Sequence, residues 1–309
     1  FFAGGLGLLV LALAWGAATG NRSARVLVAC SAASAIAAIA LSRSAAAGLT
    51  LTAAALAVGL PFVAAFLVRA PQSARVLLAA LGLIIFQAML GMWTVTLMLK
   101  PIIVTAHLLG GLSTFSLLLW AALRLHGPQR PLAISRTLVI GALLLLSVQI
   151  FLGGWTSTNY AALSCPDFPT CLGQWVPQDG YAEGFVLFRE IGVNYEGGIL
   201  DGAARAAIHW SHRLGALLVL IGMGLLIVRL FALGTERRLA GALGVLLLLQ
   251  ITLGISNVIY KLPLWTATAH NAVAALLLGT LLVVLSRAYT PAAVPLQVDR
   301  RRPLVVPGA

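Results

Sequence analysis

The sequence contains very little charge. Charged residues make up 9% of its 309 residues, whereas soluble domains contain about 25%, and hydrophobic residues make up 61%. Only eight residues are acidic, and mean hydropathy is +1.01. Since this composition leaves too little polar surface to solvate a globule of this size, it excludes a soluble fold and predicts an integral membrane protein.

Short alternating strands are also missing. Long apolar runs follow one another along most of the chain, whereas the strands of a porin-type barrel alternate over about 10 residues. The sequence therefore predicts an all-α integral membrane protein surrounded by a lipid bilayer. The net charge of +12 comes from basic residues thinly spread between the apolar runs, so we expect no nucleic-acid partner.

The start of the sequence lacks an initiator Met, a basic segment and a small-residue cleavage site. It opens with Phe1-Phe2-Ala3-Gly4 inside an apolar run. We therefore expect the sequence to begin within a helix and to lack at least one preceding element.

Apolar runs and the breakers between them predict nine helices, near 1–19, 25–41, 49–69, 75–98, 102–124, 135–156, 207–230, 239–259 and 265–287. The connecting segments alternate between two sides. One side holds 14 of the 20 Lys and Arg residues and the other holds 6, so the first side is expected to be cytoplasmic. The Ala-rich pair within 25–69 has almost no polar side chain, and we assign it no chemistry.

The one long connection, 157–206, is expected on the outer side as an ordered cap over the helices. It holds Cys165 and Cys171, separated by a segment with two prolines that favours closure of a small ring. Disulfides persist on that side of the membrane, so we predict a disulfide between them. A redox-active pair is the alternative. Cys30 lies in an Ala-rich helix and is expected to be a buried small hydrophobe.

An internal repeat occurs at a fixed offset of 163 residues. Gln87, Gly91 and His107 recur without a gap, together with their neighbours, as Gln250, Gly254 and His270. The Gln-x-x-Leu-Gly part of this repeat occurs a third time, at 149–153. The repeat predicts two related bundles, an N-terminal one within 1–124 and a C-terminal one within 135–287, followed by a cytoplasmic tail at 288–309.

Four histidines are predicted at a similar depth below the outer surface: His107, His209, His212 and His270. Any one of them could be an isolated helix-packing residue. Four at equal depth instead indicate an ion, proton or cofactor site. Zinc or copper would need further ligands, and none is evident. Haem needs only one or two axial imidazoles, so it is the most economical ligand. Arg213 is predicted either to pair with a haem propionate or to extend to the lipid headgroups.

Several motifs together resemble haem A synthase of the bacterial and mitochondrial type. They are the segments 87–96, 104–111, 159–171, 194–198, 208–215 and 269–275, and the resemblance covers roughly 75–290. It implies an enzyme of two pseudosymmetric transmembrane four-helix bundles in a bacterial inner membrane. The enzyme would oxidise a methyl group of haem O to the formyl group of haem A for haem-copper terminal oxidases.

The resemblance also implies roles for particular residues. His212 and His270 would be the axial ligands of a haem b, with Arg213 beside it, and His107 would face the substrate haem O. The partner of His107 belongs to a Glu-x-x-His-Arg motif that precedes a stretch like Phe2-Ala3-Gly4. The first bundle is therefore expected to be incomplete, without that catalytic motif, and to carry the extra helix pair at 25–69. His209 stands where the motif would have Glu, and its role is left open.

Two other functions are weighed against this one. A plain b-type cytochrome with bis-His haems would act only in membrane electron transfer. A transporter is disfavoured, because transporters favour inverted repeats and broken helices at the midplane. As partners the resemblance implies haem O synthase and a membrane electron acceptor, and a homo-oligomer is compatible with the sequence.

Overall fold

The structure is a computed structural model that describes residues 11, 16, 22–41, 47–67, 72–125 and 129–290. Its helices are α2 (Arg22–Leu41), α3 (Ala47–Leu67), α4 (Gln72–Thr96), α5 (Pro101–Leu125), α6 (Arg136–Thr158), α7 (Tyr181–Gly184), α8 (Gly202–Ala232), α9 (Arg237–Ile259) and α10 (Leu264–Ala288). The Phe2-Ala3-Gly4 stretch, nearly all of the predicted helix 1–19, and the tail beyond residue 290 lie outside the described residues.

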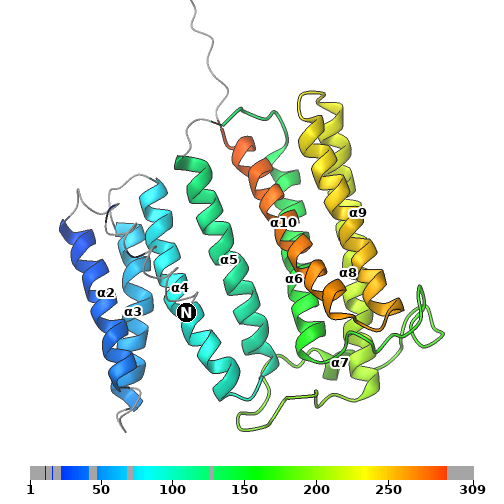
Figure 1. The fold of residues 1–309 in the computed structure, drawn as a ribbon, viewed down its shortest axis with the longest axis horizontal. Coiled ribbons are helices and arrows are strands. Elements are labelled where there is room, and N and C mark those ends of the chain that lie inside the picture. The colour runs from blue at the N-terminus through cyan, green and yellow to red at the C-terminus, as the bar shows by residue number, and fades with distance from the viewer. Residues whose placement is uncertain are drawn as a thin grey trace, which may run out of the picture.

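Six of the described helices, α4, α5, α6, α8, α9 and α10, are long and apolar enough to cross a membrane. The prediction of an all-α, multi-pass membrane protein is therefore confirmed. The long helices lie side by side with α2 and α3 at one edge, next to α4 (Figure 1).

Helices α6, α8, α9 and α10 contact one another in a closed ring: α6 on α8, α8 on α9, α9 on α10, and α10 on α6. They share one core, to which each helix contributes fully buried side chains such as Val139, Met223, Leu243 and Leu277. Helix α5 packs against α4, α6 and α10, and so joins this ring to the N-terminal helices. The division of the chain into two pseudosymmetric bundles stays a prediction.

Helix α8 begins at Gly202, earlier than the predicted start at 207. Asp201 caps it, because its carboxylate accepts a hydrogen bond of 2.7 Å from the N–H of Ala204. The prediction followed the apolar run and missed this cap. The added residues place His209 and His212 well inside the helix.

Helices α4, α6 and α9, which carry Gln87, Gln149 and Gln250, each end in a turn of the same type. In each, a residue eleven positions after the glutamine has a positive φ: Met98 at 49°, Tyr160 at 54° and Lys261 at 57°. The N–H of the following residue donates to the carbonyl five residues back, at 2.9, 2.9 and 2.7 Å respectively. This is the geometry of a Schellman cap. The repeat seen in the sequence therefore extends to the backbone of the helix ends.

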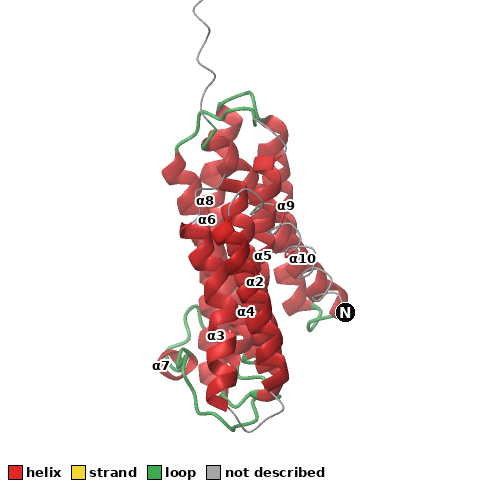
Figure 2. Cartoon of the chain, turned by 90° about the vertical axis from the view of Figure 1, so that its left-hand side faces the viewer, coloured by secondary structure: helices red, strands yellow, loops and turns green. Residues whose placement is uncertain are grey.

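The segment between α6 and α8, with the short α7, covers one end of the helices (Figure 2). Trp155, at the end of α6, is fully buried beneath it and donates its indole N–H to the carbonyl of Gly184 at 2.8 Å. The N–H of Tyr195 donates to the carbonyl of Met98 at 3.0 Å. The segment is thus fixed both to α6 and to the α4–α5 turn, as expected for an ordered cap.

Trp155→Phe should destabilise the protein by about 2 kcal/mol, because it leaves the buried Gly184 carbonyl without a donor and reduces the packed volume. Thermal unfolding of the purified variant, followed by circular dichroism, measures this. Trp175→Phe is the control, since Trp175 is 70% exposed. An unchanged unfolding temperature for Trp155→Phe would contradict the anchoring role of the indole.

Candidate functional site

Three histidines lie in equivalent surroundings, each on a helix that pairs with a glutamine-bearing helix. His107 on α5 faces α4, His212 on α8 faces α6, and His270 on α10 faces α9. The Cε1 atom of each ring lies 3.1 Å from the position that a Cβ would occupy on a glycine of the facing helix, respectively Gly91, Gly153 and Gly254. The glycines therefore provide the room for the imidazole edges.

A glutamine amide reaches each of these histidines. Gln87 Nε2 donates to the backbone carbonyl of His107. Gln149 Nε2 donates to the carbonyl of His212 at 3.0 Å and lies 3.1 Å from its Nδ1. Gln250 Nε2 lies 3.2 Å from Nε2 of His270. Each histidine is thus tied to the neighbouring helix by its own glutamine.

Each of the three rings keeps a nitrogen without a hydrogen-bond partner among the described residues. For His107 and His270 this includes a buried Nδ1. For His212, Nδ1 faces Gln149, and Nε2 makes no hydrogen bond with a described residue but is not a fully buried atom. A buried imidazole nitrogen without a partner is costly unless something binds it. These nitrogens are therefore available to a ligand.

His212 and His270 come from α8 and α10, which lie opposite each other in the ring of α6, α8, α9 and α10. Among the described residues there is no group of three or more His, Cys, Asp and Glu side chains that could hold a bare metal ion. Two imidazoles from separate helices suit an iron whose other ligands come from a macrocycle. The donor set therefore fits haem, as the sequence analysis expected.

His209 differs from the other three histidines. It is 4% exposed, and its Nδ1 accepts a hydrogen bond of 3.2 Å from the N–H of Cys165. Its Nε2 lies 3.4 Å from Nε of Arg213. The sequence analysis grouped His209 with the ligand candidates by depth, whereas in the structure protein groups face both of its ring nitrogens. It anchors the outer segment to α8.

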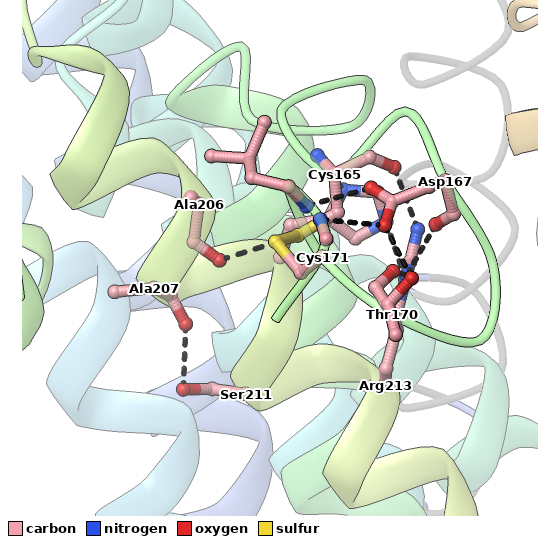
Figure 3. The surroundings of a disulfide bond; sticks show 11 residues. Cys165, Asp167, Thr170, Cys171, Ala206, Ala207, Ser211 and Arg213 are labelled. Atoms are coloured by element: carbon pink, nitrogen blue, oxygen red, sulfur yellow. Dashed lines mark hydrogen bonds between the residues drawn. A yellow bond between two sulfur atoms is a disulfide. The ribbon is translucent and has the colours of Figure 1, made fainter. Parts of the chain in front are cut away.

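Arg213 holds the same segment. Its Nη1 donates to the carbonyls of Asp167 and Thr170, both at 2.8 Å, and its Nη2 donates to the carbonyl of Cys165 at 2.7 Å (Figure 3). The sequence alone does not indicate this role, because only the fold brings residues 165–170 over α8. Since Arg213 directly follows His212, the cap is fixed to the helix next to a ligand candidate.

The predicted disulfide between Cys165 and Cys171 is present, and both residues are fully buried beside Ala206 of α8. Cys30, in contrast, is exposed on α2, so the expectation that it is buried is wrong. Among the described helices α2 packs chiefly against α3, and its side chains Val26 and Ile36 are exposed as Cys30 is.

A cavity of about 680 Å³ lies at the opposite end of the helices, where Arg130, Arg237 and Arg238 line it together with the ion pair of Arg287 and Glu236. None of the candidate histidines lines it. It is therefore separate from the candidate site.

A family model described as cytochrome oxidase assembly protein matches residues 41–282. The chain belongs to the cytochrome oxidase assembly protein family. The matched residues contain all three glutamine–histidine pairs as well as the disulfide.

Curated relatives within the family carry the name heme A synthase. The chain is 46% identical to one from Shewanella oneidensis over 208 residues, which cover 65% of this chain and 63% of the relative. It is 30% identical to one from Beijerinckia indica over 243 residues, covering 72% and 64% of the two chains. It is also 30% identical to one from Rhizorhabdus wittichii over 192 residues, covering 57% and 48%. The chain thus spans less than two thirds of the length of these relatives.

We expect the stability of the cap to depend on pH through the carboxylate of Asp167. Its carboxylate accepts hydrogen bonds from the Thr170 hydroxyl and from the N–H groups of Gly173 and Leu172, which hold its pKa well below the ordinary value of 3.8. Because the folded-state pKa is lowered, the carboxylate stabilises the cap above about pH 4, and this contribution is lost as the pH falls further.

Asp167→Asn should therefore lower the unfolding temperature at pH 6 and make it less dependent on pH between 5 and about 3 than in the wild type. Asp179→Asn, which changes an exposed carboxylate of the same segment, is the control and should keep the wild-type slope. Equal slopes for wild type and Asp167→Asn would show that this carboxylate does not set the acid sensitivity.

Proposed function

We propose that the protein is a haem A synthase, which oxidises a methyl group of haem O to the formyl group of haem A. The observation that carries the proposal is the pair His212 and His270, imidazoles on the opposite helices α8 and α10 of one four-helix ring, each with a nitrogen that no described residue occupies. The family and the names of the relatives support it.

In this proposal His212 and His270 would hold a resident haem b, which would supply one-electron transfer. His107 faces the substrate haem O from α5. Arg213 has five N–H groups, of which four face the cap and His209. One N–H on Nη2 remains for a propionate, so the guanidinium can hold the cap and a haem edge together.

The chemistry sets further requirements. Conversion of a methyl to a formyl group removes four electrons and adds one oxygen atom, here by two hydroxylations followed by loss of water from the gem-diol. With a membrane electron acceptor that receives all four electrons, each hydroxylation takes its oxygen atom from a water molecule and releases two protons, and the gem-diol then loses one water. The protein's task is to hold the methyl group in place and to limit the water that reaches it, for which the cap is suited.

The proposal includes location and partners. The segment 159–201 would lie in the periplasm of a bacterial inner membrane and the C-terminus in the cytoplasm, since most basic residues lie at the end opposite the cap. Haem O synthase would supply the substrate. A homo-oligomer is compatible with this arrangement.

His212→Ala and His270→Ala should each abolish or shift the low-spin haem b spectrum of the purified protein, because each removes one axial ligand. His107→Ala should leave that spectrum largely intact, since His107 lies on α5, outside the α6–α8–α9–α10 ring. Absorption spectra of oxidised and reduced protein measure this. If both His212→Ala and His270→Ala keep the wild-type spectrum, the ligand assignment is wrong.

The reaction itself is tested by supplying haem O to the natural gene product in membranes and extracting the haems for chromatography. The proposal predicts haem A, and it predicts that His107→Ala abolishes its formation. Haem b without any haem A would instead favour a bis-His cytochrome that acts only in electron transfer.

A further inference from the structure

The three glutamines Gln87, Gln149 and Gln250 have no part in the reaction proposed above, yet each one contacts a candidate haem-ligating histidine. They come from α4, α6 and α9, and each reaches across to the helix that carries the histidine. A side-chain amide within a membrane-spanning helix is unfavourable in lipid, so its recurrence at one place in three helix pairs indicates a shared task.

Glycines make room for these amides. A Cβ on Gly215 would lie 2.2 Å from Gln149 Oε1, and a Cβ on Gly110 would lie 2.1 Å from Gln87 Oε1. Both glycines lie three residues after the histidine, so in these two pairs the amide lies over the helix backbone and donates to the histidine carbonyl.

The third pair differs in a way that agrees with this explanation. Three residues after His270 the sequence has Val273 instead of glycine. There Gln250 makes no bond to the histidine carbonyl, and its amide nitrogen meets the imidazole ring at 3.2 Å. The residue at this position therefore correlates with whether the amide contacts the backbone or only the ring.

We propose that Gln87, Gln149 and Gln250 are positioning residues that fix the orientation of the haem-ligating imidazoles and, for Gln149 and Gln250, tune their basicity through contact with a ring nitrogen. This inference rests on the proposed function, because it requires that the histidines bind haem iron. The physical basis is that a ligating imidazole donates the N–H of its other nitrogen to an acceptor, and that this bond sets both its plane and its donor strength. On these glutamines the acceptor is Oε1, which is buried and has no hydrogen-bond partner among the described residues, so the amide must turn to present Oε1 to the ring N–H when the imidazole binds iron.

The test uses Gln149 and the haem b of the purified protein. Gln149→Leu removes the amide and should weaken haem binding by about 10–100-fold, the usual effect of losing such a partner. It should also alter the g values of the ferric haem in electron paramagnetic resonance, because the ring plane is no longer fixed. Gln149→Glu should keep the haem but lower its midpoint potential, since a carboxylate that accepts from the ring N–H makes the imidazole a stronger donor to ferric iron.

A second variant leaves the glutamine in place. Gly215→Ala should displace the Gln149 amide, and it should alter the g values in the same direction as Gln149→Leu. Alanine is the better helix former, so loss of helix stability would not explain this effect. Gly224→Ala is the matched control on the same helix, because a Cβ there meets nothing within 4 Å. It should leave affinity, potential and g values unchanged.

His212→Ala, measured alongside, distinguishes a failure of the glutamine role from a failure of the haem assignment. If it abolishes the haem signal while Gln149→Leu, Gln149→Glu and Gly215→Ala all keep wild-type affinity, potential and g values, the positioning role is overturned and the haem site stands. If His212→Ala itself keeps the wild-type signal, the haem assignment fails and the inference fails with it.

Discussion

The free-energy cost of placing imidazole side chains among membrane-spanning helices is the constraint on which the rest of this structure depends. An unsatisfied ring nitrogen in such a place is unfavourable, and water is not available to relieve it. At His212 and His270 a glutamine amide from the neighbouring helix lies beside one ring nitrogen, whereas at His107 the glutamine donates to the backbone carbonyl. In the proposed function the other ring nitrogen of His212 and of His270 is left for the iron of a haem.

This arrangement requires helices that approach closely and in fixed register. Gly91, Gly153 and Gly254 receive the edges of the three rings, and a side chain at any of them would press on the imidazole. The identical caps after α4, α6 and α9 fix where each of these helices ends relative to its glutamine. Histidine, glutamine, glycine and cap thus form one unit that occurs three times in the described residues.

The sequence predicted the class of the fold, the approximate helices, the internal repeat and the disulfide, because each depends on a pattern that is local or strictly periodic. It did not predict what depends on long-range packing. His209 and His212 are only three residues apart, yet one supports the cap and the other faces Gln149. The contacts of Arg213 with residues 165–170 were missed for the same reason. The recurrence of Gln87, Gln149 and Gln250 was visible in the sequence, but their bonds to the histidines were not.

The central claim is that α8 and α10 hold one haem between them. The most direct measurement is a cryo-electron microscopy map of the haem-loaded natural gene product at a resolution that separates side chains. The account predicts a flat ring between these helices, with its iron bound by one nitrogen of His212 and one nitrogen of His270. A ring located elsewhere, or an iron bound by residues other than these two, would contradict it.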